Sequence, residues 1–260
     1  MNLKAYIAAA LVALAPVAAS AATVDINFQA FGAKKSSADI AGAIAARNAF
    51  IGSMPIVVQE NFDGFTACDN TNGASCSAGT LDTAVGQFSG LIPAISTGGS
   101  QVAPKDKIVV RSDSPNPFNR FDVEGTDGTW LDSNDMNGIN WDIPGNTGLS
   151  NITKIAFFLT DVDDVGNVRF QISAQNGSLT NIITNAPFGK LADGNLFLVT
   201  MLFSDAVDNL NIQMISGTND GFGVDGITVA AVPLPAAGLL LFGALGGLAA
   251  LRRRKKALAA

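Results

Sequence analysis

The feature that most constrains the fold is a long series of short apolar or alternating runs, each bounded by Gly, Asn, Asp or Pro. Runs of this length are typical of β-strands, and the bounding residues are typical of tight turns. Such a series predicts an all-β chain folded as an antiparallel β-sandwich. The segments expected to form strands are 24–31, 56–60, 84–91, 107–111, 118–123, 138–143, 152–160, 166–173, 179–184, 195–203, 208–215 and 222–230.

One segment near the N-terminus, 37–51, has helical periodicity instead. Ser37 can cap this helix, and Pro55 follows it. Arg47 falls on the apolar stripe of the helix and does not fit it. The residues that form the stripe at helical spacing are Ile40, Ala43, Ile44, Phe50 and Ile51.

The first residues are expected to be a targeting signal. Lys4 precedes the apolar run 5–19, and small residues follow at the end of that run. This order predicts a Sec-type signal peptide over residues 1–21, cut after Ala21 or one residue later. Residues 22–231 then form a single exported domain, long enough for one substantial core.

The C-terminal segment 232–260 combines three features in a fixed order. It begins with a short motif, Val232, Pro233, Leu234, Pro235 and Ala236. A predicted transmembrane helix over 236–251 follows, and a basic stop of Arg252, Arg253, Arg254, Lys255 and Lys256 ends it. Cations of this kind remain on the cytoplasmic side of the membrane. The apolar stretch would span about 24 Å as a helix, short of the roughly 30 Å hydrocarbon core, which suits a thin or temporary anchor.

This tail resembles the VPLPA variant of the PEP-CTERM sorting signal of Gram-negative bacteria. The resemblance implies recognition and cleavage by an exosortase, a membrane transpeptidase-like cysteine enzyme. An ordinary single-pass anchor is the alternative interpretation. The preceding segments 57–65, 155–172, 195–205 and 220–229 look like the jelly-roll-like extracellular domains that commonly precede such signals. That likeness implies a jelly-roll-like sandwich and no particular activity.

Charge and residue usage exclude several functions. The exported part retains 10 of the 16 Lys and Arg and all 22 Asp and Glu, so its net charge is −12. Such a surface repels nucleic acid. The chain has no His, which excludes His-based triads and His-ligated metals. Cys68 and Cys76 lie in one polar loop, and we expect them to form a disulfide after export.

A structural calcium site is one hypothesis for the acidic residues. Glu60 and Asp63 lie near the first core strand, and Asp225 lies in the last. The first and last strands of jelly-roll modules are often neighbours, so carboxylates from both could hold one Ca²⁺ through hard oxygen ligands. The arrangement is loosely similar to calcium-stapled carbohydrate-binding modules. The alternative is that these acids face water or cap turns.

The segment 129–142 is a second candidate site. Trp130 and Trp141 bracket what reads as a loop rich in Asp and Asn, and a sugar could stack on an indole while these side chains hold its hydroxyls. The favoured alternative places both indoles in the core.

These patterns predict an exported, non-catalytic protein with a structural or adhesive role. It would be anchored in the inner membrane with a periplasmic domain, and then released to the cell surface or extracellular matrix. A glycan-binding module with extracellular polysaccharide as its partner is the alternative, and a glycoside hydrolase is a third class. No motif points to a catalytic residue, and the only metal hypothesis is calcium.

Overall fold

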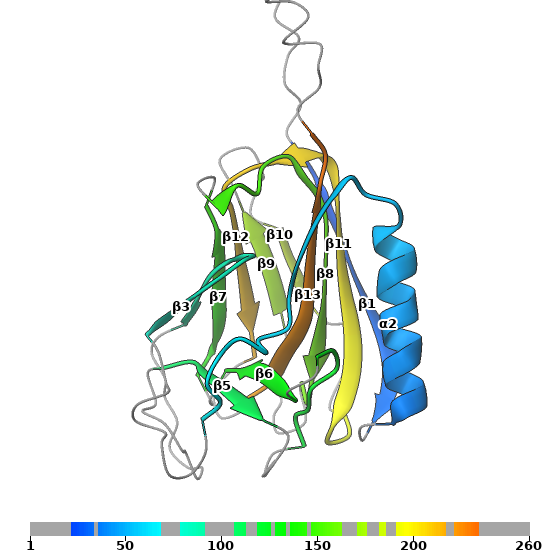
Figure 1. Cartoon of the computed structure of the whole chain (residues 1–260), viewed down its shortest axis with the longest axis vertical. Coiled ribbons are helices and arrows are strands. Elements are labelled where there is room, and N and C mark those ends of the chain that lie inside the picture. The colour runs from blue at the N-terminus through cyan, green and yellow to red at the C-terminus, as the bar shows by residue number, and fades with distance from the viewer. Residues whose placement is uncertain are drawn as a thin grey trace, which may run out of the picture.

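The computed structural model describes residues 22–33, 36–68, 79–91, 107–112, 119–125, 128–133, 136–144, 147–162, 171–175, 182–185, 191–216 and 221–233. In these residues the chain forms two antiparallel sheets with a helix on the outside of one of them (Figure 1). The predicted β-sandwich is therefore confirmed. The predicted signal peptide, and the apolar run 236–251 with its basic stop, lie outside the described residues.

The larger sheet has seven strands. Its order is β1-β11-β8-β13-β6-β5, and β2 pairs with β13 as well. Its strands are β1 (Val24–Ala33), β2 (Ile56–Glu60), β5 (Val109–Ser112), β6 (Thr129–Asp132), β8 (Ile152–Thr160), β11 (Asn195–Val207) and β13 (Gly223–Ala231). The pairing of β2 with β13 sets Glu60 opposite Ile227, so the expected neighbourhood of the first and last core strands is correct.

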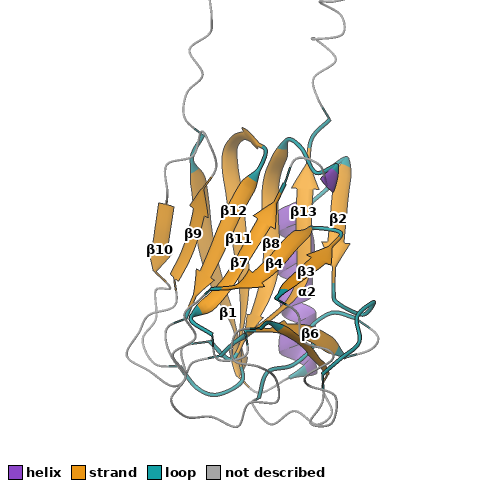
Figure 2. Cartoon of the chain, turned by 90° about the vertical axis from the view of Figure 1, so that its left-hand side faces the viewer, coloured by secondary structure: helices purple, strands orange, loops and turns teal. Residues whose placement is uncertain are grey.

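The smaller sheet has six strands in the order β10-β9-β12-β7-β4-β3. It faces the viewer in Figure 2, with helix α2 behind both sheets. Its strands are β3 (Thr80–Thr83), β4 (Gly86–Gly90), β7 (Gly138–Ile143), β9 (Gln171–Gln175), β10 (Ile182–Asn185) and β12 (Leu210–Ile215). Chain order and sheet order differ widely, so each sheet joins segments that are distant in sequence.

The main core lies between the two sheets. Trp141 stacks on Phe88 in its own sheet at 5.3 Å between ring centroids. It also meets the edge of Phe157, from the opposite sheet, at 6.2 Å. All three side chains are fully buried. One indole thus fastens the two layers together through its large apolar surface.

Helix α2 (Ser37–Ile51) covers the outer face of the seven-stranded sheet and builds a second, smaller core there. Its bounds match the predicted segment, but Ser36 and not Ser37 is the N-cap, with the hydroxyl of Ser36 accepting a hydrogen bond from the Asp39 N–H. Gly52 ends the helix at a positive φ of 62°. Within the described residues, no helix is long and apolar enough to cross a membrane.

Most strand predictions agree with the structure, and there are three differences. Strand β3 (Thr80–Thr83) was not predicted, because it precedes the predicted run 84–91. Residues 119–125 are irregular, whereas a strand was predicted over 118–123. The segment 129–142, interpreted as containing a loop between two Trp residues, begins with strand β6, which was not predicted, and ends with β7, which matches the predicted run 138–143. Its Asp and Asn residues resemble turn signals, but strand pairing with distant segments overrides that local preference.

The strand directions place both ends of the sandwich domain together. Asp25 near the start of β1 pairs with Leu202, which pairs with Lys154, which pairs with Ala230 near the end of β13. One row of cross-strand neighbours therefore joins the start of the first strand to the end of the last. The chain enters and leaves the domain at the same end of the sandwich.

Candidate functional site

The outward face of the six-stranded sheet has polar side chains on the five strands β3, β4, β7, β12 and β9. Along β7, Ile139, Trp141 and Ile143 are buried, whereas Asn140 and Asp142 between them are half-buried and face outward. Strand β12 alternates in the same way. This is the period-two pattern of a strand with one face on the core and the other toward solvent.

The register aligns these polar residues across the sheet in two adjacent rows. We call the two rows together the polar face. The first row runs across five strands through Asp82, Gln87, Asp142, Asn211 and Gln175. The second row runs beside it through Thr80, Ser89, Asn140, Gln213 and Ser173. Five strands at about 4.8 Å spacing make each row about 19 Å long.

Asp142 is the centre of a hydrogen-bond network on the polar face. Its Oδ2 accepts a hydrogen bond from Asn140 Nδ2 at 2.8 Å, and its Oδ1 accepts one from Asn211 Nδ2. Asn211 Nδ2 also donates to Asn140 Oδ1 at 2.9 Å. These bonds fix the carboxylate in one orientation, and each of its oxygens can accept a further hydrogen bond.

The network extends from Asn211 on one side, and a separate hydrogen-bonded pair, Asp82 and Gln87, lies on the other. Gln87 Nε2 donates to Asp82 Oδ1 at 2.7 Å, and Gln175 Nε2 donates to Asn211 Oδ1 at 3.2 Å. Gln213 Nε2 lies 3.4 Å from Asn140 Oδ1. The side chains of the first row, together with Asn140 and Gln213, are thereby held in a defined arrangement before any ligand arrives.

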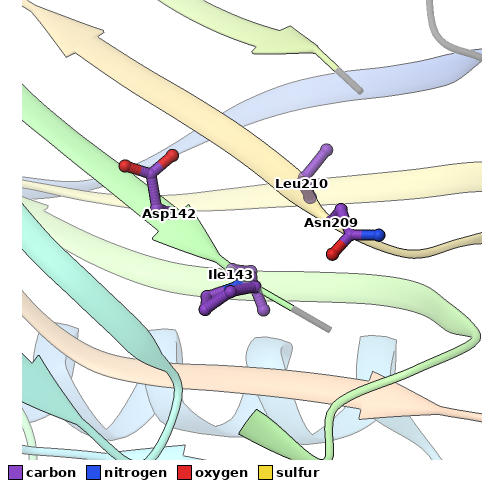
Figure 3. A pocket seen from close by; sticks show the side chains of 5 residues that line it. Asp142, Ile143, Asn209 and Leu210 are labelled. Atoms are coloured by element: carbon purple, nitrogen blue, oxygen red, sulfur yellow. The ribbon is translucent and has the colours of Figure 1, made fainter. Parts of the chain in front are cut away.

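Two pockets meet at Asp142. The larger, of about 420 Å³, is lined by Asp82, Thr83, Gly86, Gln87, Asp142, Pro144 and Thr147. The smaller, of about 240 Å³, is lined by Asp142, Ile143, Pro144, Asn209 and Leu210, and Figure 3 shows Asp142 and Asn209 on its two sides. The shared residues Asp142 and Pro144 form the boundary between the two pockets.

A glycine shapes the floor of the larger pocket. Gly86 has a φ of 129°, and a Cβ at this position would lie 2.3 Å from the carbonyl oxygen of Asp142. Any other residue would therefore push β4 away from β7. The close approach lets Trp141 Nε1 donate to Val85 O at 3.0 Å beneath the pocket.

The pockets open at the end of the sandwich where the chain enters and leaves. Pro144 and Thr147 precede β8, whose first residue Ile152 pairs with Ala231 at the end of β13. The Val232 N–H donates to Asn151 O at 3.0 Å in this region. The outgoing chain is thus hydrogen-bonded to the segment that borders the pockets.

The predicted glycan contact through Trp130 and Trp141 is wrong. Their side chains are 1 % and 0 % exposed. A sugar ring stacks only on an indole face that solvent can reach, so neither residue can serve. The alternative interpretation, that both residues belong to the core, is confirmed.

The three predicted calcium ligands each have protein partners. Glu60 Oε1 accepts the Phe62 N–H at 2.8 Å. Asp63 Oδ2 accepts from Asn61 Nδ2 at 3.1 Å and its Oδ1 accepts from Thr129 Oγ1 at 3.3 Å. Among the residues that the structure describes, no three His, Cys, Asp or Glu side chains gather to hold a metal. A calcium site therefore stays a prediction from the sequence.

Asp225 is the most unusual of these three acids. It is 1 % exposed, and its Oδ2 accepts the N–H groups of Val123 at 2.7 Å and Glu124 at 2.8 Å. Burial raises the pKa of the Asp225 carboxyl well above its usual value, and the nearby Asp122 raises it further. The backbone donors Val123 and Gly226 act in the opposite direction. This carboxyl fastens the loop 119–125 to the sheet.

The remaining predicted residues are placed only in part. Cys68 is buried, and its N–H donates to Val110 O at 2.6 Å. Cys76 lies outside the described residues, so the disulfide stays a prediction. Val232 and Pro233 follow β13 directly, while Leu234, Pro235 and Ala236 lie outside the described residues.

The sequence contains a signal for the polar face in two segments that were predicted as strands. The peptide 138–143 alternates Ile, Asn, Trp, Asp and Ile after its first Gly, and 210–215 alternates in the same way. Alternation predicts which residues of one strand face outward. It does not predict which strands are neighbours, and the rows depend on that.

Comparisons with known proteins give only distant likeness. No protein-family model matches the chain, and no curated protein resembles it in sequence. The chain is similar to the CBM35 from Cellvibrio japonicus Abf62, with 13% identity and a TM-score of 0.27 over 68% of this chain and 95% of that one.

It is also similar to the C-terminal family 22 carbohydrate binding module of Clostridium thermocellum Xyn10B. In that case the identity is 14% and the TM-score is 0.29, over 63% of this chain and 98% of the other. Likeness at this level carries no information about what this chain binds.

Proposed function

We propose that this chain is a non-catalytic saccharide-binding protein whose ligand lies along the polar face. The observation that carries the proposal is the pair of cross-strand rows of Asp, Asn, Gln, Ser and Thr side chains that meet two pockets at Asp142. Amide side chains offer both donors and acceptors, and carboxylates offer acceptors. Sugar hydroxyls need this combination.

The size and order of the polar face favour a chain over a single sugar. The row from Asp82 to Gln175 is about 19 Å long. Hydrogen bonds link Asp82 to Gln87 and, separately, Asp142 to Asn211 and Asn211 to Gln175. Because the side chains are already held in place, an extended ligand would lose little of its binding free energy in ordering them. The ligand of this proposal is therefore an oligosaccharide or polysaccharide.

The proposal fits the expected route of the protein. A Sec signal peptide and a VPLPA-type tail would export the domain and pass it to an exosortase, and a saccharide-binding face would then attach it to surface or matrix polysaccharide. Before processing, a tail in the inner membrane would hold the domain by the end at which β13 stops. The structural or adhesive role is then a consequence of glycan binding.

The test is binding of the exported protein to a glycan array, followed by affinity electrophoresis with the polysaccharides that it retains. Gln87→Ala and Asn211→Ala each remove side-chain hydrogen bonds from the first row. We expect each to weaken binding about tenfold, equivalent to about 1.4 kcal/mol. Gln29→Ala is the matched control because Gln29 is exposed on β1 of the other sheet.

Three results would contradict the proposal. The first is no retention by any saccharide, and the second is equal binding by Asn211→Ala and the unaltered protein. The third is hydrolysis of a retained glycan that Asp142→Asn abolishes. In that last case the protein would be a glycoside hydrolase, the third class that the sequence left open, since Asp82 and Asp142 line one pocket.

A further inference from the structure

The charged residues on the strands of the six-stranded sheet are all acidic. Its strands β3, β4, β7, β9, β10 and β12 contain no Lys or Arg, and their only ionisable residues are Asp82 and Asp142. Both acids face outward in the first row of the polar face, two strands apart with Gln87 between them. The polar face is therefore negative along its own strands.

Four basic residues form their described contacts away from the polar face. Arg47 pairs with Glu124, while Arg111 and Arg120 both pair with Asp132. Lys154 Nζ donates to the carbonyl oxygen of Phe50 at 2.6 Å, at the C-terminal end of helix α2. These contacts all involve the seven-stranded sheet or the segments packed on it, so they do not neutralise the polar face.

The partners of Asp142 are neutral. The amide groups of Asn140 and Asn211 orient its two oxygens without cancelling the charge. The carboxylate is half-buried, and it lies where the two pockets meet. A ligand in either pocket would meet an acceptor-only group with a full negative charge. Such a group attracts hydroxyl and ammonium donors and repels carboxylate or sulfate.

We infer that the polar face binds amino-bearing glycans more tightly than neutral ones and rejects acidic ones, and that Asp142 sets this preference. The inference rests on the proposed saccharide binding and adds the ligand class. An ammonium group placed at Asp142 would form a charge-assisted hydrogen bond, which is stronger than a neutral one. A uronate at the same place would put two negative charges together in a partly desolvated pocket.

The experiment compares three oligosaccharide sets of matched length by titration calorimetry. They are glucosamine oligomers, their N-acetylated counterparts and galacturonate oligomers, all at a mildly acidic pH at which the amines carry protons. We expect the glucosamine oligomers to bind at least tenfold more tightly than the galacturonate oligomers. Added salt should reduce that difference, because ions screen exposed charges.

Variants separate the site from the charge of the whole domain. Asp142→Asn and Asp82→Asn each remove one charge from the polar face. If Asp142→Asn disturbs the amide network, Asp82→Asn still tests whether the charge sets the preference. We expect both to reduce the preference for glucosamine over N-acetylglucosamine oligomers severalfold. Asp25→Asn removes one charge from exposed β1 in the other sheet and should leave the preference unchanged.

The outcomes are distinct. Tightest binding of galacturonate oligomers would overturn the inference and leave saccharide binding intact. An equal loss of preference in Asp25→Asn and Asp142→Asn would also overturn it, because the overall charge would then be the cause. Binding of none of the three sets, together with an empty glycan array, would overturn the proposed function itself.

Discussion

Arg47 on helix α2 and Glu124 in the loop 119–125 form a two-point ion pair. Arg47 Nη2 donates to Glu124 Oε1 at 2.7 Å, and Nη1 donates to Oε2. The Arg47 side chain is 2 % exposed and that of Glu124 is 28 % exposed. The guanidinium also lies 5.4 Å from the Phe158 ring centroid. The pair fastens the helix to a segment 77 residues away in sequence.

We predict that this pair is energetically coupled. Arg47→Ala should lower the free energy of unfolding by about 3 kcal/mol or more, since it leaves Glu124 and the Gly226 carbonyl without a charged donor and opens space beside Phe158. Glu124→Ala should also destabilise the domain, because the buried guanidinium loses its partner. Urea unfolding of both single variants and the double variant gives the coupling energy. Strictly additive losses would show that the pair does not act as a unit.

Asp225 should make the stability of the domain depend on pH. Burial and Asp122 raise the pKa of its carboxyl in the folded state, whereas in the unfolded chain an Asp has a pKa of about 3.9. Between those two values the folded state binds more protons, so the contribution of Asp225 to stability falls as pH rises. Asp225→Asn should lack this loss, and its stability relative to the unaltered protein should increase as the pH rises above about 4.

The measurement is urea unfolding with a chelator present, so that no metal competes for the carboxyl. Asp25→Asn, on exposed β1, serves as the control for the removal of one charge. A difference between Asp225→Asn and the unaltered protein that stays constant across the pH range would contradict the prediction.

The calcium hypothesis has a direct test through ion selectivity. If Glu60, Asp63 and Asp225 bind Ca²⁺, millimolar Ca²⁺ should raise the melting temperature much more than equal Mg²⁺, because Mg²⁺ tolerates a flexible oxygen cage poorly. Ca²⁺ at 100 times its dissociation constant would add about 2.7 kcal/mol to the free energy of unfolding. Asp225→Asn should abolish the difference between the two ions. Equal shifts with both would mean that the ions act only on the net charge of −12.

A disulfide between Cys68 and Cys76 is expected to stabilise the domain moderately. Closing so short a loop contributes about 2–3 kcal/mol by the chain-entropy relation. Cys68→Ser should therefore lower the melting temperature by several degrees without abolishing the fold. Peptide mapping without reductant checks the bond, and free thiols in freshly exported protein would contradict it.

Processing at the VPLPA-type motif should remove the C-terminal tail. We expect the mature protein from its native host to end near residues 232–236 and to lack Arg252 and the cations that follow it. Intact-mass analysis gives the end of the chain. Recovery of residues 237–260 on the surface protein would show that the tail is an ordinary anchor. In a host without an exosortase, the uncut chain should stay in the inner membrane.

The sequence by itself determined the elements whose cause is local. Helix α2 occupies the predicted residues 37–51 because apolar spacing, a serine cap and a following proline are all found in the segment or within a few residues of it. Strands β2, β7 and β8 coincide with predicted runs, since alternation or continuous apolar character is a property of each strand alone. The neighbourhood of β2 and β13 was also predicted, through the jelly-roll resemblance.

Only the tertiary structure decided what depends on which segments meet. Arg47 does not fit the apolar stripe of its helix. Its burial is explained by the ion pair with Glu124, which the sequence pattern of the helix does not predict. Trp141 could have faced a ligand or the core, and packing against Phe157 of the opposite sheet places it in the core.

The polar face also depends on which segments meet in the tertiary structure. Asp142 aligns with Gln87 on one side and Asn211 on the other through pairings between strands far apart in the chain. Strand periodicity specifies the face of each residue, whereas the order and register of strands depend on how the whole set of apolar faces packs together.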